Sequence, residues 1–346
     1  MRLLLTADPE LPVPPGLYGG VQLLVAQWVE ELRRRGHQVA LVAKAGSTIA
    51  CDEFFPWPGV HSQHPLHTGR NSLALFRAAR AFRADVVHSS SRLLYTWPLL
   101  LARFPVVMTY HRLPGIRQIA CARRLSRRLV FTGVSNYIMA AGQRGGGAWR
   151  AVYNCVDLDR LTYQPETAPD APLVFLSRID ADKGAHLAIE IACRSGHPLV
   201  LAGNHSADAN AARYWREQIE PHLDGRQIRY IGPVDATQKN AVLGSSRALI
   251  VPTQCDEAFG LVFAEALACG TPAIGTHRGA VPEIIEPGRT GWLISTVEEG
   301  VAAVARIATL SRFACRQEAE RRFSISRTVS GYEAIYRELA ASPGAP

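Results

Sequence analysis

The segment EAFGLVFAEALACGTPAIG, residues 257–275, places two carboxylates eight positions apart around a Phe-Gly pair. We expect a helix to begin near Gly260, where a glycine lets a phosphate approach the free backbone N–H groups and the helix dipole favours negative charge. Glu265, two turns into that helix, can offer both carboxylate oxygens to a vicinal diol such as a ribose. Glu257, before the helix, can accept hydrogen bonds from hydroxyl groups beyond the phosphates. The alternative is a solvated pair of glutamates beside a core helix.

A second element suited to phosphate lies earlier in the chain, in SRIDADKG at residues 177–184. Arg178 and Lys183 stand five residues apart at a predicted strand-to-helix turn, and a guanidinium with an ammonium suits a diphosphate. An ordinary charged surface loop is the alternative. Both elements follow predicted strands of one domain, where a nucleotide-sugar would bind.

The elements that must position these residues are read from an alternation of short apolar runs and amphipathic stretches, which predicts parallel sheets covered by helices. The predicted strands are RLLLT (2–6), QVALVA (38–43), DVVHSS (85–90), PVVMTY (105–110), LVFTGVS (129–135), AVYNCV (151–156), LVFLSR (173–178), LVLAG (199–203), IRYIG (228–232), ALIVPT (248–253), PAIGT (272–276) and WLI (292–294). Helices are predicted at 21–35, 72–83, 116–128, 136–144 and 326–341 and in the gaps of the second series.

A loop with prolines at 165, 169 and 172 separates the two series, and 346 residues suit two domains better than one or three. We therefore predict an α/β protein with two doubly wound, Rossmann-like domains facing across a cleft. The predicted divisions are an N-terminal domain at 1–155, a C-terminal domain at 156–325 and a final helix at 326–346 that returns to the first domain.

Charge and cysteine content limit the partners and the compartment. Residues 1–150 hold 19 basic and 7 acidic side chains, whereas residues 151–346 hold 19 and 23, so an anionic partner is expected at the N-terminal half. No aromatic-basic motif supports nucleic acid as that partner. The seven cysteines are scattered and never spaced as CxxC, and no apolar run is long enough for a signal peptide or a membrane span, so a cytoplasmic protein is expected.

The motifs together resemble those of the family 4 retaining glycosyltransferases, which have the two-domain GT-B fold. The matching segments are YGGV (18–21), VVHSS (86–90), TYH (109–111), VS (134–135), NCVD (154–157), SRIDADKG (177–184), LAG (201–203), YIG (230–232), EAFGLVFAEALACGTPAIG (257–275), VPEII (281–285) and TGWLI (290–294). The resemblance covers essentially the whole chain, and its C-terminal motifs are the more specific ones.

The resemblance implies a role for each matching residue. Arg178 and Lys183 look like the pair that neutralises the donor diphosphate, Glu265 like the ribose ligand and Glu257 like the carboxylate that meets the donor sugar. The other implied donor-binding positions are backbone groups of Phe259, Gly260, Leu261 and Val262, Val234 at the base, His111 against the donor sugar, and Gly19 and Gly20 in a loop over the phosphates.

The chain departs from the family pattern at three positions. Cys155 stands where the family often has Gly, and Ala258 stands where Gly or Pro is usual. Ser177 stands where a Gly commonly precedes the arginine. None of these changes removes a charged ligand. Two DxD triplets, at 157–159 and 180–182, could indicate a metal site. We expect none, because the first triplet lies at the interdomain joint and the second lies between two cations that can serve in place of a metal.

An acceptor surface is suggested by a predicted basic amphipathic helix over residues 116–130. The basic arc of that helix comprises Arg117, Arg123, Arg124, Arg127 and Arg128, opposite an apolar arc. The arc predicts contact with an anionic acceptor or with the inner face of a membrane, and a solvated outer helix is the alternative.

The resulting expectation is a metal-independent glycosyltransferase that moves a sugar from a nucleoside-diphosphate-sugar to a hydroxyl of a glycan, a lipid-linked molecule or a small molecule. The resemblance favours a UDP-sugar or GDP-sugar co-substrate over an ADP-sugar and requires no other cofactor. Two alternatives remain open at this point: a nucleotide-sugar epimerase or hydrolase on the same fold, and a nucleotide-sugar-binding protein without catalysis.

Overall fold

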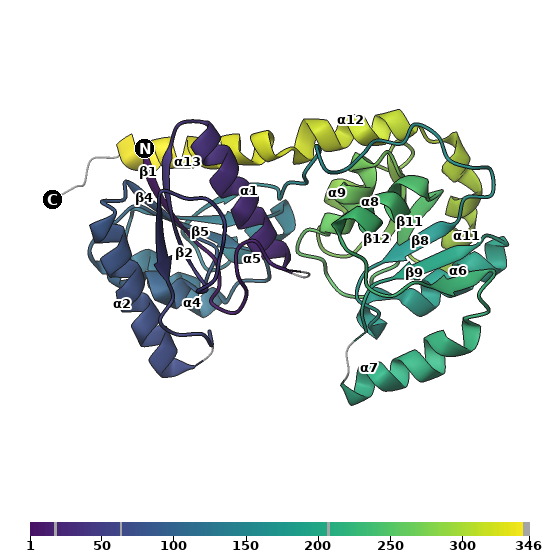
Figure 1. The fold of residues 1–346 in the computed structure, drawn as a ribbon, viewed down its shortest axis with the longest axis horizontal. Coiled ribbons are helices and arrows are strands. Elements are labelled where there is room, and N and C mark those ends of the chain that lie inside the picture. The colour runs from purple at the N-terminus through teal and green to yellow at the C-terminus, as the bar shows by residue number, and fades with distance from the viewer. Residues whose placement is uncertain (17–18, 63, 206–207, 342–346) are drawn as a thin grey trace. The chain divides into compact units, whose positions relative to one another are not determined.

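The computed structural model describes residues 1–16, 19–62, 64–205 and 208–341, and the chain forms two compact units (Figure 1). Unit 1 comprises Met1–Asn154 and the C-terminal segment that begins at Ile325. Unit 2 comprises Cys155–Ser324. The chain therefore passes between the units twice, and each unit is built around its own parallel sheet.

Unit 1 contains a seven-stranded sheet, within the described residues, in the order β3-β2-β1-β4-β5-β6-β7, and every neighbouring pair is parallel. Its strands are β1 (Arg2–Thr6), β2 (Gln38–Ala43), β3 (Glu53–Pro56), β4 (Val86–Ser89), β5 (Val106–Tyr110), β6 (Leu129–Gly133) and β7 (Ala148–Ala151). Its helices are α1 (Gly20–Arg34), α2 (Pro65–Ala81), η1 (Leu93–Thr96), α3 (Trp97–Leu101), α4 (Ile116–Leu125), α5 (Asn136–Gln143) and α13 (Ile325–Ala341). Apolar runs such as Leu3-Leu4-Leu5 form strands here because helices cover them and bury their side chains.

The second unit repeats this architecture with a parallel sheet that has, in the part of the unit that the structure describes, six strands in the order β10-β9-β8-β11-β12-β13. Its strands are β8 (Leu173–Leu176), β9 (Leu199–Ala202), β10 (Ile228–Tyr230), β11 (Ala248–Val251), β12 (Ala273–Thr276) and β13 (Gly291–Ile294). Its helices are η2 (Ala181–Lys183), α6 (Ala185–Ser195), α7 (Ala209–Tyr214), η3 (Trp215–Ile219), η4 (Glu220–His222), α8 (Ala236–Ser245), α9 (Leu261–Ala268), α10 (Val281–Ile284), α11 (Val297–Arg306), η5 (Ile307–Thr309) and α12 (Arg312–Phe323). The α/β class and the parallel sheets predicted from the sequence are confirmed.

Helix α13 is fixed to the N-terminal sheet by buried polar contacts. The carboxylate of Glu333 accepts from Arg35 and contacts His37, each at 2.8 Å, which joins α13 to the end of α1. Deeper in the unit, the hydroxyl of Tyr336 lies 2.6 Å from Nδ1 of the buried His88 on β4. Helix α13 is therefore part of the unit 1 core.

Two predicted elements of unit 1 were wrong. The predicted strand at 151–156 lies earlier, as β7, because Trp149 is buried against Phe131 at a ring separation of 5.0 Å and fixes the pairing with β6. The predicted helix at 116–130 ends at Leu125, because Leu129 pairs with Val106 in the sheet and the backbone of Ser126 is already extended.

Candidate active site

The carboxyl ends of β8, β9 and β11 meet at one edge of the unit 2 sheet, since these neighbouring strands are parallel. Arg178 lies two residues after the end of β8, Gly203 directly follows β9, and the loop that contains Glu257 follows β11. Open α/β sheets bind ligands at this edge. The two elements that the sequence analysis singled out therefore lie on adjacent strand ends.

Lys183 and Glu257 form an ion pair at the centre of this edge, with Nζ and Oε1 2.6 Å apart. The two side chains are only 12% and 19% exposed. Burial disfavours the charged form of Lys183, but the Glu257 carboxylate outweighs this effect and the pKa of Lys183 is raised above its usual range. Lys183 is thus a fixed, partly desolvated cation, with the Cys255 sulfur 3.4 Å from its ammonium.

The loop that carries Lys183 is held against the end of β11 by backbone contacts. The carbonyl of Asp182 accepts from the N–H of Gln254 at 2.6 Å and from the hydroxyl of Thr253 at 3.2 Å. Gly184 follows in a left-handed conformation, with φ of 76°, and a Cβ there would lie 2.2 Å from the carbonyl oxygen of Pro252. Only glycine permits so close an approach of the two loops.

Arg178 lies on the same loop but in a more open position, 46% exposed. Its guanidinium pairs with Asp180 at 2.5 Å and with Asp182 at 4.0 Å. The DxD triplet at 180–182 thus holds an arginine. Across the described parts of the chain, no three His, Cys, Asp or Glu side chains are grouped so that they could hold a metal ion.

The N-terminus of α9 follows Glu257 and opens at Gly260, whose φ is 88°. The N–H of Phe263 bonds to the Gly260 carbonyl at 3.0 Å, and the N–H groups of Leu261 and Val262 belong to the first turn, which has no partner within its own helix. Phe259, directly before Gly260, is buried and its ring packs against Phe323. The helix start predicted near Gly260 is confirmed, and it can supply backbone donors to an anion.

Gly279 is a site residue that the sequence analysis missed. A Cβ at this position would lie 2.3 Å from the carbonyl oxygen of Glu257 and 2.5 Å from its nitrogen. The neighbouring Ala280 N–H donates to the same carbonyl at 2.8 Å. The loop after β12 therefore fixes the backbone of Glu257, and the sequence contains no sign of this contact beyond a glycine after Arg278.

Glu265, on the second turn of α9, forms an ion pair with Lys239 of α8. Both side chains are mostly buried, and Lys239 was also missed from the sequence. A capping box between Asp235 and Gln238 fixes the start of α8 and places Lys239 in its first turns. Val234, the position predicted to border the base, is half-buried directly before this cap. Helix α8 therefore connects Val234 to Lys239, the partner of the predicted ribose ligand Glu265.

His111 belongs to unit 1 and follows β5. Its ring is stacked on Trp28 at 6.0 Å, and its Nε2 lies 3.4 Å from the Ser90 hydroxyl. Burial, with a smaller contribution from Arg112, lowers the pKa of His111 to about 4, so the imidazole is neutral near pH 7. Its buried Nδ1 has no hydrogen-bond partner in the described part of the chain.

Gly19 and Gly20 lie at the start of α1, in the same unit. Gly19 caps the helix with φ of 152°, and a Cβ there would lie 2.8 Å from the side chain of Pro15. The first turn of α1 contains no acidic residue. Tyr18 of the YGGV motif lies outside the described residues.

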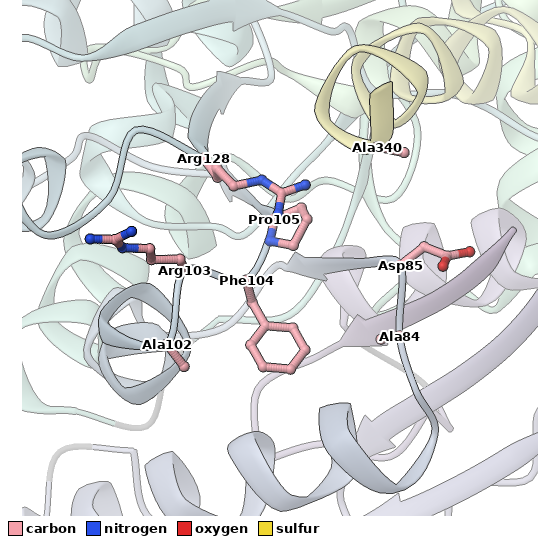
Figure 2. A pocket seen from close by; sticks show the side chains of 8 residues that line it. All are labelled: Ala84, Asp85, Ala102, Arg103, Phe104, Pro105, Arg128 and Ala340. Carbon is pink, nitrogen blue, oxygen red and sulfur yellow. The ribbon is translucent and has the colours of Figure 1, made fainter. Parts of the chain in front are cut away.

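The predicted five-arginine arc is not on one helix. Arg117, Arg123 and Arg124 are exposed on α4, whereas Arg127 and Arg128 follow the end of this helix. Arg128 turns inward and donates to the Leu339 carbonyl of α13 at 3.0 Å. It lines a hollow of about 370 Å³ at the amino edge of the sheet, together with Arg103 (Figure 2). The remaining lining residues are Ala84, Asp85, Ala102, Phe104, Pro105 and Ala340.

No helix in the described ranges is both long and apolar enough to cross a bilayer.

Comparison with known families gives two adjacent matches that together span most of the chain. Glycosyltransferase Family 4 matches residues 18–160, and Glycosyl transferases group 1 matches residues 164–322. A relative in Mycobacterium leprae, a phosphatidyl-myo-inositol mannosyltransferase, is 26% identical over 94% of this chain and 94% of its own length.

Solved structures of glycosyltransferases share the fold. A glycosyltransferase involved in avilamycin A biosynthesis is 23% identical with a TM-score of 0.73, over 99% of this chain and 98% of the other. The Anabaena protein HepE, solved in complex with UDP-glucose, is 16% identical with a TM-score of 0.75, over 99% and 100%. The fold of this chain is accordingly GT-B.

Proposed function

Since this chain belongs to the family 4 glycosyltransferases, the glycosyl transferases group 1, we propose that it transfers a sugar with retention from a nucleoside-diphosphate-sugar to an acceptor hydroxyl, without a metal ion. The observation that carries the proposal is the buried Lys183–Glu257 pair, 2.6 Å apart, beside the N-terminus of α9. A fixed cation and open helix N–H groups suit a diphosphate, and a carboxylate beside them suits a sugar hydroxyl.

Unit 2 is proposed to bind the donor. Arg178 and Lys183 neutralise the diphosphate, the backbone of Phe259, Gly260, Leu261 and Val262 contacts phosphate and sugar, and Glu265 binds the ribose. Val234, directly before the α8 cap, borders the base. Lys239 supports this assignment because its ion pair orients Glu265 before the donor arrives.

Unit 1 is proposed to bind the acceptor. By resemblance to the family, Gly19 and Gly20 are assigned to the donor phosphates, and His111, as a neutral imidazole, is assigned to the donor sugar. Neutrality is supported by the lowered pKa, and a neutral ring can accept from a hydroxyl as well as donate.

The proposed reaction needs no nucleophilic side chain. The acceptor oxygen attacks the anomeric carbon on the face from which the diphosphate leaves, and the leaving phosphate oxygen takes the acceptor proton. Catalysis then consists of stabilising the leaving diphosphate and aligning the acceptor. Arg178 and Lys183 provide the positive charge that a metal ion would otherwise supply.

The proposed donor is a UDP-sugar or a GDP-sugar. The former is supported by the UDP-glucose complex of HepE, a protein of the same fold. The acceptor is proposed to be a glycan, a lipid-linked molecule or a small molecule bound by unit 1. The exposed arginines of α4 support an anionic acceptor or peripheral contact with an anionic membrane surface.

The experiment that tests the proposal is a thermal-shift series with UDP, GDP and ADP and their sugars, in the presence of EDTA. UDP or GDP should stabilise the protein more than ADP, because ligand that binds only the folded state raises its stability. Transfer with the preferred donor should survive EDTA. If chelation abolishes transfer and Mg²⁺ or Mn²⁺ restores it, the metal-independent mechanism is wrong. If no nucleotide stabilises the protein, the donor assignment is wrong.

A further inference from the structure

A row of polar side chains at the carboxyl edge of the unit 1 sheet takes no part in the proposed donor site. Asp8 follows β1, Arg92 follows β4 and Arg112 follows β5. These three strands are adjacent in the sheet and parallel, so their carboxyl ends meet at the same edge. All of the groups come from unit 1.

Asp8 presents a carboxylate oxygen that the surrounding protein does not satisfy. Its Oδ1 is buried and has no hydrogen-bond partner among the residues that the structure describes. Hydroxyl groups at the ends of β1 and β4 are bonded to one another, since Oγ1 of Thr6 lies 2.8 Å from Oγ of Ser91, and the Oγ atoms of Ser89 and Ser91 are 3.0 Å apart. A buried carboxylate oxygen without a hydrogen-bond partner is costly, so it needs an explanation, and a bound ligand that donates to it would provide one.

Two guanidinium groups accompany this carboxylate. Arg92 is half-buried and donates one N–H to the carbonyl of Ser62. Arg112 is exposed, and the structure shows no ion pair for it within the described ranges. Both lower the pKa of Asp8, but burial first and Glu10 second outweigh them and raise it to about 6. The two arginines therefore act on the Asp8 carboxylate, but they do not offset the effect of its burial on its pKa.

We propose that Asp8, Arg92 and Arg112 form an acceptor subsite for a polyol or sugar that carries a free hydroxyl beside an anionic group of phosphate type. Asp8 accepts the hydrogen bond of the hydroxyl, and the arginines bind the anion, for which a guanidinium fork is suited. The inference rests on the proposed function, because it names the class of acceptor that would meet the donor sugar.

The test is a titration of the full chain with glucose 6-phosphate, glycerol 1-phosphate, glucose, glycerol and inorganic phosphate. The phosphorylated polyols should bind about tenfold or more tightly than either their neutral counterparts or inorganic phosphate, since hydrogen bonds to charged groups are worth that much. Arg112→Gln should remove the preference for phosphorylated probes, and Asp8→Asn the preference over inorganic phosphate. Asp85→Asn, at the opposite edge of the sheet, is the matched control.

The pH dependence separates recognition by Asp8 from a structural effect. The charged and titratable groups that act on Asp8 are Glu10, Arg92, Arg112 and, through its own shifted pKa, Tyr95. The preference for phosphorylated polyols over inorganic phosphate should fall as pH drops through about 6, where Asp8 becomes protonated. The ratio of the two affinities is the readout, because phosphate groups also change charge at about pH 6 and this affects both probes. Asp8→Glu should keep a pH-dependent preference and Asp8→Asn should lose it.

The outcomes distinguish this inference from the proposed function. If UDP or GDP stabilises the chain but phosphorylated polyols bind no better than inorganic phosphate, the subsite is wrong and the donor site stands. If Asp8→Asn binds every probe as the unaltered chain does, the subsite is also wrong. If phosphorylated polyols bind with the expected dependence on Asp8 and Arg112 while no nucleotide binds, the subsite stands and the proposed function fails.

Discussion

Two lysine–glutamate pairs organise the candidate site at the scale of single residues. Lys183–Glu257 lies at the strand edge, and Lys239–Glu265 lies between α8 and α9. Each pair is mostly buried, so each glutamate is fixed by a cation while one of its oxygens can face a ligand. Preorganised charges of this kind act strongly on a developing charge, because they need no rearrangement during the reaction.

Removing the Lys183 ammonium should lower the rate of sugar transfer far more than it lowers the stability of the fold. Lys183→Ala is expected to lower kcat/KM by about 3 kcal/mol or more of transition-state stabilisation, the scale of one preorganised donor to an anion. Arg194→Ala, which removes an exposed cation paired with Glu298, serves as the control and should leave kcat/KM unchanged. A similar loss in both variants, or no loss in Lys183→Ala, would contradict the role of the buried cation.

The two glutamates should affect different steps, because Glu265 is assigned to the nucleoside and Glu257 to the sugar. Glu265→Gln should weaken the binding of free UDP or GDP, measured by calorimetry. Glu257→Gln should leave that binding nearly unchanged and reduce kcat. Equal weakening of nucleotide binding by both variants would show that this division of roles is wrong.

Asp8 gives a prediction for stability that is independent of any acceptor. Its pKa is raised from 3.8 to about 6, first by burial, so the folded state holds the proton more tightly than the unfolded state. Stability from this group is complete below its ordinary pKa and is lost as pH rises through about 6. Asp8→Asn, which stays neutral, should therefore raise the free energy of unfolding at about pH 8 by up to ~3 kcal/mol and change it little at about pH 4. Denaturant unfolding at both pH values checks this, and equal effects at both would contradict it.

At the scale of elements, the site depends on loops that approach one another closely through glycine. Gly184 brings the loop after β8 against Pro252, and Gly279 brings the loop after β12 against the backbone of Glu257. These contacts join three neighbouring strand ends into one surface. The positions of Lys183 and Glu257 are thus set by backbone geometry as much as by their own ion pair.

Gly184 and Gly196 offer a matched comparison at the two ends of α6. Both are left-handed, with φ of 76° and 71°, but only Gly184 faces another backbone, and nothing lies within 4 Å of a Cβ at Gly196. Gly196→Ala should cost only the strain of a left-handed alanine, about 1 kcal/mol, whereas Gly184→Ala should cost clearly more. Denaturant unfolding of both variants measures the difference, and equal losses would exclude the close approach to Pro252 as a constraint.

The sequence was most informative where the elements are regular and buried on both faces. Runs such as LLL at 3–5 and LVFL at 173–176 became central strands because parallel sheets hide both of their faces. The pattern of apolar runs predicts where strands end, and so it also predicts that Arg178 and Glu257 lie at strand ends. It does not predict contacts between elements that are distant in the sequence, such as Lys239 with Glu265 or Gly279 with Glu257.

The error at residues 126–130 has the same origin. The helical pattern of arginines continues past Leu125, so local periodicity favours a longer helix than the structure contains. Pairing of Leu129 with Val106 overrides that preference, and Arg128 turns toward α13 instead of continuing the basic arc. Tertiary contacts rather than propensity therefore decide where the basic surface ends.

For the whole molecule, the charge is divided unevenly between the two parts of the chain. Residues 1–150 carry 19 basic and 7 acidic side chains, and the remainder carries 19 and 23. The donor proposed for unit 2 would need only a few fixed cations, so the positive excess of unit 1 is left for another partner. An anionic surface would suit this excess, and its attraction decays over a Debye length, about 8 Å at physiological salt.

If the exposed arginines of α4 meet an anionic membrane, each should contribute about 1 kcal/mol to its binding. We expect the full chain to bind phosphatidylglycerol vesicles better than phosphatidylcholine vesicles, and the difference to fall steeply with salt. Arg117→Glu with Arg124→Glu should abolish it without changing nucleotide affinity, since both side chains are exposed. Arg128 is left unaltered because it bonds to α13. Co-sedimentation over a salt series measures the binding. Equal partitioning to both vesicle types would show that these arginines are ordinary solvent-exposed side chains of a helix.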